Sequence, residues 1–349
     1  MSVTESVFGT LLNGAVVKAY TLQNASGASL TVTPYGCRIL RLQMPDRNGV
    51  LGDVVLGHAT LEEYLGMDFH GSFVGRYANR IGGAKMKIDG VICALDQNDG
   101  RNSLHGGRGG YHQILFAVKE ITDGDSPSIE FTYTSPDGEE SYPGTLEVSV
   151  KYTLTAENEL VMDYRGETDK KTVFNPTNHA FFNLSGDPQK PVYDTELTIH
   201  AETITAVRDD LIPTGELLPV SGTPLDFRTA KPIGQDIRDS SPLTQLTGGY
   251  DHNFCGTGEG FREMAVAYDP ESGRGVTVLS DRPGVQLYTM NTVDEGVKNR
   301  DGSQMQPHTA FCLETQFYPD SPNRPEFPFA YVEPGKPLIS KTVYRFFTK

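Results

Sequence analysis

Residues 175–184 contain the side chains that are best suited to chemistry. His179 stands there among amide and hydroxyl side chains, and the aromatic residues Phe181 and Phe182 follow it. Amides and hydroxyls can fix the orientation of an imidazole, while aromatic rings shield it from bulk water. Because the ordinary pKa of histidine lies near neutrality, this setting suits a proton donor. The alternative is a core histidine that is only hydrogen-bonded to the backbone.

Glu314 is the second candidate, because it interrupts an apolar run between Phe311 and Phe317. On an alternating strand this side chain could simply point to solvent. If it points inward, burial raises the pKa of the carboxyl and makes it a competent general base. A histidine acid and a glutamate base that face one small molecule form a proton-shuttling site.

Four further segments are dense in polar groups that packing alone does not require. Residues 75–81 contain two arginines and an amide, and residues 102–107 place His105 beside paired glycines. Such glycines allow another group to approach the backbone closely. The remaining two segments, residues 249–254 and 283–288, contain Asp251 and Gln286. We expect these segments to meet the His179 and Glu314 segments around one site.

The elements that position these residues are predicted to be strands. Residues 146–154 and 129–134 alternate between apolar and polar side chains, and a turn-rich segment separates them, which indicates antiparallel strands joined by a long loop. Shorter strand patterns occur at residues 30–33, 196–200, 275–279 and 342–347. The best helix signal, residues 60–66, has Thr60 as N-cap and Gly66 as stop, and allows a turn or two. One large antiparallel β domain over residues 1–349, with a few short helices, is the prediction.

Composition limits the partners. The chain has 349 residues with 37 glycines and 22 prolines, which is typical of many turns. The net charge of −15 argues against nucleic acid and anionic membrane surfaces. The four cysteines show no metal-ligand spacing, and no apolar stretch is long enough to span a bilayer. We therefore expect a cytoplasmic protein that needs no metal and no cofactor.

Taken in order, these segments resemble the aldose 1-epimerase family, also called galactose mutarotases. The pattern Asn-x-Thr-Asn-His-x-Phe-Phe-Asn-Leu at residues 175–184 is specific to that family, and the resemblance covers essentially the whole chain. It implies an all-β fold, a β-supersandwich in which large antiparallel sheets pack around an open sugar cleft. The strand patterns alone indicate only a large all-β domain.

The resemblance also implies roles for individual residues. Glu314 corresponds to the general base, His179 to the general acid, and His105 to a group beside the ring oxygen or anomeric centre. The positions implied to hold sugar hydroxyls are Asn79, Arg80, Asp251 and Gln286. The implied reaction interconverts the α- and β-anomers of free aldoses such as galactose and glucose. The implied enzyme is a monomer or a homodimer that binds a small aldose.

Three alternatives stay open at the level of sequence. A glycoside hydrolase could use Asp251 and Glu314 as paired carboxylates, but it leaves His179 and His105 without roles. A non-catalytic sugar-binding or regulatory protein on the same fold needs no acid–base couple. An epimerase for hexose 6-phosphates should need a basic pocket, and no additional arginine cluster stands out.

Several polar residues are expected to be structural. His252, and also His58, His70, His112, His200 and His308, are interpreted as structural because most of them have no polar partner in the sequence. Arg76 is as well explained by a surface ion pair as by the site, since exposed pairs are common and weak. The cysteines are interpreted as buried thiols.

Overall fold

Strand β13 (Leu146–Leu154) shows how the alternating sequence becomes a half-buried strand. In the computed structural model, which describes residues 3–349, every second residue of β13 is buried. The strand pairs antiparallel with β12 (Ser128–Ser135), so that Phe131 lies opposite Val150. Residues 136–145 form the loop between them. The predicted antiparallel pair is therefore confirmed.

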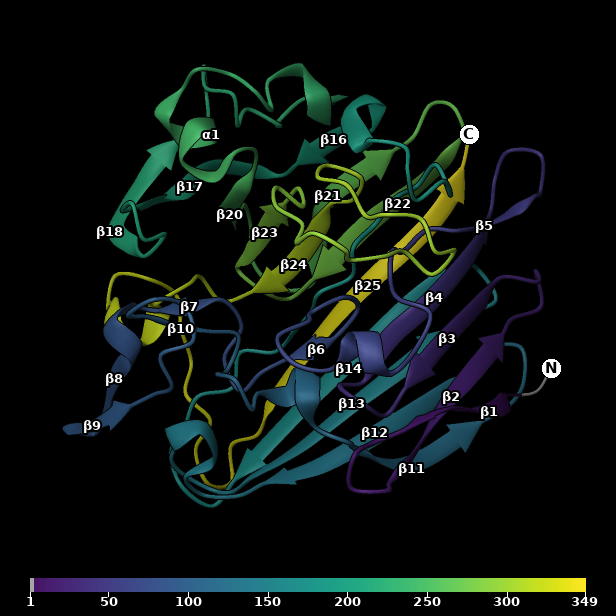
Figure 1. Cartoon of the computed structure of the whole chain (residues 1–349). Helices are drawn as coiled ribbons and strands as arrows, with labels where there is room; N and C mark the ends of the chain where they lie inside the picture. The colour runs from purple at the N-terminus through teal and green to yellow at the C-terminus, as the bar shows by residue number, and fades with distance from the viewer. Residues whose placement is uncertain (1–2) are drawn as a thin grey trace.

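These strands belong to a nine-stranded antiparallel sheet, which runs diagonally through Figure 1. Its order is β11-β12-β13-β14-β25-β22-β21-β16-β19. The other bounds are β11 Ala117–Thr122, β14 Glu159–Thr168, β25 Leu338–Thr348, β22 Arg274–Ser280, β21 Arg262–Tyr268, β16 Glu196–Ile199 and β19 Lys231–Pro232. The short strands predicted near residues 196–200, 275–279 and 342–347 are all members of it.

Two five-stranded antiparallel sheets pack against this large sheet. The first has the order β1-β2-β3-β4-β5, with bounds Thr4–Thr10, Val16–Gln23, Ser29–Thr33, Arg38–Pro45 and Leu51–Asp53. The second, which we call the site sheet, has the order β18-β17-β20-β23-β24. Its bounds are Pro213–Pro219, Ala201–Val207, Asp251–Gly256, Gly284–Tyr288 and Cys312–Gln316.

Small elements fill the connections between the sheets. Three two-stranded pairs are β7 (Arg80–Ile81) with β10 (Ser103–Leu104), β6 (Phe73–Val74) with β15 (Thr177–Asn178), and β8 (Lys85–Ile88) with β9 (Val91–Ala94). The α-helix is α1 (Pro242–Thr247). Single 3-10 turns lie at Glu62–Tyr64, Gly82–Ala84, Tyr111–Gln113, Glu139–Ser141, Val192–Asp194, Ile233–Gln235 and Ser321–Asn323. Within residues 3–349 no helix is long and apolar enough to cross a membrane.

The helix expectations are only partly met. Residues 60–66 form the single 3-10 turn Glu62–Tyr64, although the Glu63 carboxylate does accept hydrogen bonds from the Thr60 N–H and hydroxyl. Helix α1 was not predicted. Its local signals are the Ser241 hydroxyl, which accepts from the Leu243 N–H, and Gly248, which ends the helix with a φ of 67°.

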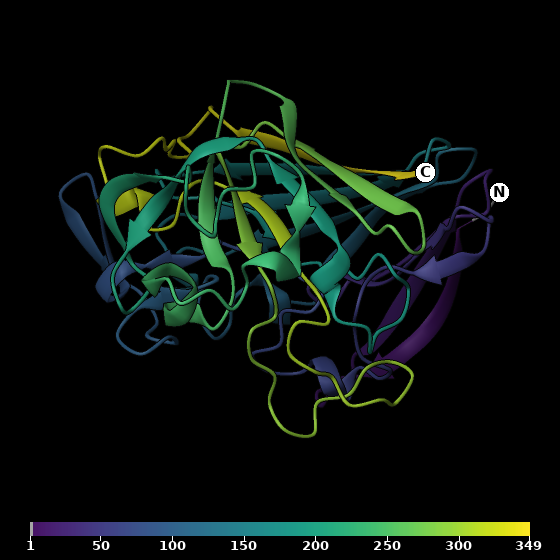
Figure 2. The same cartoon turned by 90° about the horizontal axis from the view of Figure 1, so that it is seen from above.

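One hydrophobic core joins all three large sheets and fixes the site sheet over the nine-stranded sheet. The Tyr344 hydroxyl on β25 donates to the Leu313 carbonyl on β24 at 3.0 Å. On the other side, the Tyr152 hydroxyl on β13 donates to the Cys37 carbonyl at 2.7 Å. Figure 2 shows the layers from above, with β1 and the end of β25 toward the same side of the molecule. The packing leaves one face of the site sheet turned away from this core.

Candidate active site

Glu314 lies in the middle of β24, a strand in which every residue is buried. Only 1% of Glu314 is exposed, so the interpretation as a solvent-facing strand residue is wrong. Burial and the neighbouring Asp251 raise the pKa of the Glu314 carboxyl well above its ordinary value, while Arg80 acts in the opposite direction. The structure therefore makes Glu314 an inward-facing, desolvated carboxyl.

His179 follows β15 and faces Glu314. Its Nε2 lies 3.6 Å from Glu314 Oε1, and its ring stacks on Phe181 and Phe69 at centroid distances of 4.9 and 5.9 Å. Backbone hydrogen bonds fix the segment, because the His179 N–H donates to the Ser72 carbonyl at 2.9 Å. Burial lowers the pKa of His179 to about 3. The two shifts favour an uncharged pair that shares one proton.

His105 lies beside this pair, with its ring centroid 5.2 Å from that of His179. Its Nδ1 accepts the Asn79 N–H at 3.2 Å, which leaves the ring proton on Nε2. Burial, and after it the neighbouring His179 and Arg80, lower the pKa of His105 well below 6.5, so the ring is neutral. The backbone is fixed by Gly106, where a Cβ would lie 2.0 Å from the Gly75 carbonyl oxygen. The expected close approach at the paired glycines is confirmed.

Three of the four residues expected to hold hydroxyls line the same cavity. Asn79 accepts the Arg80 N–H at 2.8 Å, and Arg80 Nε donates to Asp99 at 2.8 Å. Asp251 lies 4.0 Å from the Arg80 guanidinium. Gln286 is not among the lining residues; it lies behind Asp251 and donates to its carboxylate at 2.6 Å. Gln286 therefore contacts the site only indirectly, by holding the Asp251 carboxylate, and not as a lining residue as expected.

These groups surround a cavity of about 510 Å³. Its volume falls in the range that accommodates a small organic molecule. The cavity is lined by the sequence-predicted Asn79, Arg80, His105, His179, Asp251 and Glu314, and by further residues that sequence reasoning missed, among them Asp68, Phe69, His70, Tyr288, Met290 and Asn291. The signal that could have drawn attention to the first three is Asp68-Phe69-His70, a carboxylate, ring and imidazole in succession.

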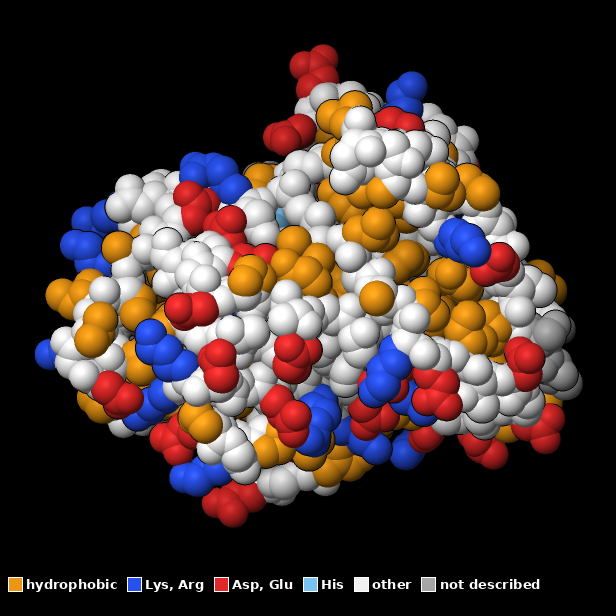
Figure 3. Space-filling view, turned by 90° about the horizontal axis from the view of Figure 1, so that it is seen from below, with side chains coloured by type: hydrophobic (Ala, Val, Ile, Leu, Met, Phe, Trp, Pro, Cys, Tyr) orange, Lys and Arg blue, Asp and Glu red, His pale blue; other side chains and the backbone are white. Residues whose placement is uncertain are grey.

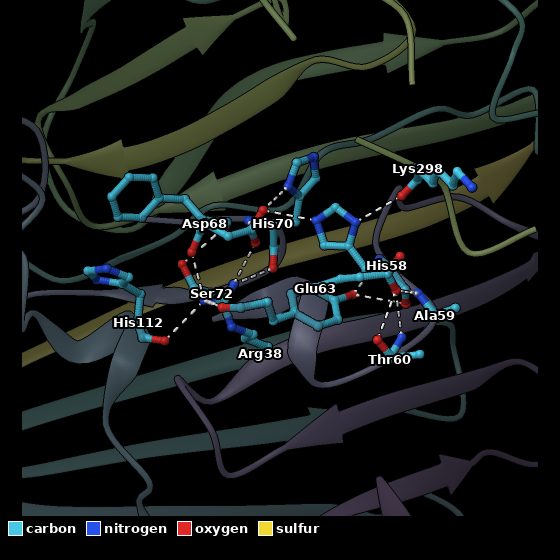
Figure 4. A network of polar contacts seen from close by, with 12 residues as sticks. Arg38, His58, Ala59, Thr60, Glu63, Asp68, His70, Ser72, His112 and Lys298 are labelled. Carbon is cyan, nitrogen blue, oxygen red and sulfur yellow. Dashed lines mark hydrogen bonds and ion pairs between the residues drawn. The ribbon is translucent and has the colours of Figure 1, made fainter. Parts of the chain in front are cut away.

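A buried polar network holds this missed wall in place (Figure 4). The fully buried Arg38 guanidinium donates to the Asp68 carboxylate at 3.1 Å and to the Asp68 and His70 carbonyls at 2.6 and 3.0 Å. The other carboxylate oxygen of Asp68 contacts His58 Nε2 at 2.9 Å and His70 Nδ1 at 2.8 Å. Asp68 is thus a polar partner of both histidines, so the premise that they lack one is wrong. His58 has a structural role, as expected, whereas His70 also lines the cavity.

His58 also connects two walls of the cavity. Its Nδ1 lies 2.9 Å from the carbonyl oxygen of Lys298, which directly follows the lining residue Val297. Because a carbonyl and a carboxylate are both acceptors, His58 must carry a proton on each nitrogen. Although burial acts to lower it, the Asp68 contact raises the pKa of His58 above 6.5. The imidazolium therefore joins the two segments.

The other polar residues have structural surroundings. Arg76 is 2% exposed and donates to the Gly144 carbonyl at 2.8 Å, so a surface ion pair is the wrong explanation for it. His252 is buried beneath Asp251, as expected. Cys37, Cys255 and Cys312 are buried free thiols, whereas Cys93 is partly exposed. None of these groups is among the lining residues of the cavity.

Among residues 3–349, two groups of side chains have ligand atoms close enough to hold a metal ion. In His58, Asp68 and His70, and in His105, His179 and Glu314, these atoms lie within 4.8 Å of one another. In the first group, both Asp68 oxygens already receive hydrogen bonds from Arg38, His58 and His70. In the second, the imidazole and carboxyl are arranged so that a proton can move through a bound hydroxyl. The absence of a metal requirement stays a prediction.

The sequence is similar to known proteins over almost its whole length. The family described as Aldose 1-epimerase matches residues 18–345. Galactose mutarotase from Sus scrofa is 40% identical over 349 residues, which cover 99% of each chain. Aldose 1-epimerase from Escherichia coli K12 is 32% identical over 339 residues, 96% of each chain.

Solved structures show the same fold. Galactose 1-epimerase from Lactobacillus acidophilus has a TM-score of 0.87 at 26% identity, and the match covers 100% of this chain and 99% of that one. An aldose epimerase homologue from C. elegans has a TM-score of 0.86 at 28% identity, covering 94% and 98%. The family match and these identities apply to almost the entire sequence. The chain belongs to the aldose 1-epimerase family.

Proposed function

We propose that this protein is a cofactor-independent aldose 1-epimerase that interconverts the α- and β-anomers of free aldoses such as galactose and glucose. The observation that carries the proposal is the pairing of His179 Nε2 with Glu314 Oε1 at 3.6 Å in a buried cavity. The names of the relatives, galactose mutarotase and aldose 1-epimerase, support the reaction and the sugar class.

In the proposed reaction, the reacting form of the pair carries its shared proton on His179, so Glu314 is the general base and His179 the general acid. Glu314 accepts the proton of the anomeric hydroxyl while His179 donates a proton to the ring oxygen, and the bond between C1 and the ring oxygen breaks. Rotation about the C1–C2 bond presents the other face of the aldehyde. The reverse transfers then close the ring as the other anomer, so protons and electrons balance without an external reactant.

The remaining residues bind and orient the sugar in this proposal. His105 donates its Nε2 proton toward the ring oxygen or the anomeric centre, which its single tautomer supports. Asn79, Arg80 and Asp251 hold hydroxyl groups from the cavity wall, and Gln286 supports Asp251. A neutral imidazole and a charged guanidinium suit an uncharged polyol, since both can donate hydrogen bonds.

The rival functions explain fewer of these contacts. A glycoside hydrolase would use Asp251 as a free carboxyl, yet Asp251 is engaged by Gln286 and lies close to Arg80. A binding protein has no use for a desolvated acid–base pair. Among residues 3–349, Arg80 is the only arginine or lysine that lines the cavity. A phosphate group would need a more basic pocket, so the lining favours a free aldose over a hexose 6-phosphate.

The proposal extends to the whole protein. Residues 1–349 are proposed to form one domain, which the family match over residues 18–345 supports. The partner is a small aldose rather than nucleic acid or a membrane; acidic and basic side chains are mixed on the face seen in Figure 3, and the net charge is −15. We propose a cytoplasmic monomer or homodimer, and the four free cysteines are typical of a reducing compartment.

Polarimetry tests the function directly. Freshly dissolved α-D-galactose and α-D-glucose are followed with the wild type, with Glu314→Gln and with buffer alone. The proposal expects the wild type to accelerate the change in rotation and the variant to behave almost like buffer. Release of reducing sugar from aryl glycosides would favour the hydrolase instead, and binding of galactose without acceleration would favour the binding protein.

A further inference from the structure

Beside Glu314, several buried amide side chains lie on the same face of the site sheet. Glu314 on β24 lies opposite Gln286 on β23, and Gln286 lies opposite Asn253 on β20. Gln316 follows Glu314 by two residues in β24, so its side chain points to the same face. All four side chains are at least 96% buried. We call Asn253, Gln286 and Gln316 the amide cluster.

The polar atoms of this cluster lack partners to an unusual degree. Among the side chains of residues 3–349, Glu314 Oε2, Gln286 Oε1 and both polar atoms of Asn253 and Gln316 are buried without a hydrogen bond. Buried polar atoms almost always have a partner, and an internal water typically makes about three hydrogen bonds to such groups. A cluster of orphaned donors and acceptors beside one carboxyl therefore points to a shared hydration site.

The backbone makes room for such a site. Gly284 lies opposite Gln316 in the pairing of β23 with β24. A Cβ at Gly284 would lie 2.6 Å from the Asn253 Oδ1 atom and 2.9 Å from the Tyr318 ring. The Asn253 amide and the Tyr318 ring therefore both extend over Gly284. The missing side chain leaves room for the Asn253 amide on the face of the sheet that also carries Glu314 and Gln316.

The charges around Glu314 show what these amides can do. Glu314 faces His179, His105, Asp251 and Arg80. Burial and, after it, the nearby Glu314 raise the pKa of the Cys312 thiol and of the Tyr344 phenol. Of the groups that Glu314 faces, Arg80 favours the carboxylate, whereas burial and Asp251 oppose it. The N–H groups of Gln286 are directed at Asp251. The uncommitted donors of the cluster belong to Gln316 and Asn253.

We propose that Gln316 and Asn253 are positioning residues for Glu314. Their amide N–H groups donate through buried water to Glu314 Oε2, stabilise the ionised carboxylate and keep Oε1 directed at His179 and the sugar. The inference rests on the proposed function, because it explains how a carboxyl that burial would keep protonated can act as a base. Neither residue contacts the sugar in this proposal, so both act through Glu314.

The test replaces Gln316 with methionine, which has a similar shape but no N–H donor. As a matched control, Thr315→Val removes a buried polar group from the same strand on its opposite face, where Thr315 contacts the Thr342 hydroxyl. Two quantities are measured for each protein. They are kcat and KM for α-D-galactose across pH, and the titration of the Glu314 carboxyl by ¹³C NMR, with its signal identified by its absence in Glu314→Gln.

In Gln316→Met, the Glu314 titration is expected to move up by about one pH unit, which corresponds to about a tenfold loss in carboxylate stabilisation. At neutral pH, kcat should fall about tenfold while KM changes less than about twofold, since sugar contacts are preserved. The alkaline limb of the kcat profile, where the His179–Glu314 pair loses its shared proton, should move to higher pH. Thr315→Val should leave the titration where it is in the wild type.

An unchanged Glu314 titration in a folded Gln316→Met protein would overturn the inference. If that variant does not fold, Asn253→Leu replaces it, because it removes the other proposed amide donor at a similar size, adds no charge and should move the titration in the same direction. The failure of the proposed function is recognised separately, as a wild type that does not accelerate mutarotation. The NMR comparison still decides the role of Gln316 in that case.

Discussion

Glu314 and His179 together illustrate how burial acts on single residues. Burial raises the pKa of the carboxyl and lowers that of the imidazole, so each group opposes its own charge. The raised pKa alone would keep Glu314 protonated, and the lowered pKa alone would keep His179 neutral, so neither shift by itself produces the ionised base or the protonated acid. The 3.6 Å separation lets one proton serve both groups, and the apparent pKa values will belong to the pair.

Glu314→Gln should separate activity from stability. General base catalysis supplies about a hundredfold to ten-thousandfold, so kcat should fall by at least about a hundredfold. A raised folded-state pKa means that ionised Glu314 destabilises the fold above the unfolded pKa near 4.5. The variant should thus unfold at an equal or higher temperature at pH 7.5, with the difference shrinking toward pH 4. Calorimetry at both pH values and polarimetry check this; near-wild-type turnover would exclude Glu314 as the base.

His179→Ala should slow ring opening by about a hundredfold or more, because it removes the proposed general acid, whose Nε2 lies 3.6 Å from Glu314 Oε1. The matched control is His308→Ala, which removes a buried histidine outside the cavity lining. Initial rates of α-D-galactose mutarotation measure both. An unchanged rate in His179→Ala would rule it out as the acid.

The pH dependence of the wild type follows from the same pair. The active state holds one proton between Glu314 and His179. Because the His179 pKa is lowered to about 3, the acid limb of kcat should lie below pH 6.5, and because the Glu314 pKa is raised, the alkaline limb should lie well above pH 4.5. The expected profile is a broad bell that includes neutral pH. A single sigmoidal limb through neutrality would contradict the shared proton.

At the scale of elements, strands β20, β23 and β24 bring the amide cluster to Glu314. Loops bring His105 and the lining residues 68–70, which we call the Asp68 wall. The loops depend on backbone positions that only glycine tolerates without strain. Gly106 has a φ of 88°, and a Cβ there would meet the Gly75 carbonyl. The catalytic geometry therefore depends on a close contact between two loops, not on the strands alone.

Gly106→Ala should therefore damage the site through the backbone. The added methyl must displace the Gly75 segment, which should move His105 and lower kcat/KM by about tenfold or more while also lowering the unfolding temperature. Gly124→Ala is a suitable control, since it also has a positive φ but an open environment. Equal kinetics in the two variants would show that the Gly106 contact does not position His105.

The His58 contact should make the stability of the cavity wall depend on pH. The folded-state pKa of His58 is raised, so its contribution is fully present below pH 6.5 and is lost as pH rises through the folded value. A hydrogen bond to a charged group contributes about 1.5–3 kcal/mol. The difference in urea unfolding free energy between wild type and His58→Gln should therefore be largest near pH 5.5 and shrink toward pH 9. A difference that grows with pH would contradict an imidazolium between Asp68 and Lys298.

At the scale of the whole molecule, three sheets share one core, and the cavity lies at the face of the site sheet that is turned away from that core. A sugar that binds there stabilises the folded chain by mass action, about 2.7 kcal/mol at a hundred times the dissociation constant. Galactose should therefore raise the unfolding temperature of both wild type and Glu314→Gln, because the amide preserves the binding contacts. Differential scanning fluorimetry with increasing galactose measures this, and mannitol, which has no anomeric centre, is the control. No shift with any aldose would point to another ligand.

The sequence by itself determined the alternating strands and the residue types that we propose for the chemistry. Alternation at residues 146–154 follows from the two-residue period of a strand, and that period is a local property of the chain. The motif around His179 and the acidic residue within the apolar run at Glu314 were also visible, because the identity of each residue is read directly from the sequence.

Only the tertiary structure decided which way Glu314 points and what surrounds it. A strand pattern does not tell which face a partner will cover, and β24 is buried on both faces. The Asp68 wall was missed because its partners, Arg38 and His58, come from other segments. The amide cluster was missed because Asn253, Gln286 and Gln316 become neighbours only through the pairing of β20, β23 and β24. Contacts between strands distant in sequence depend on register and packing, which no local pattern contains.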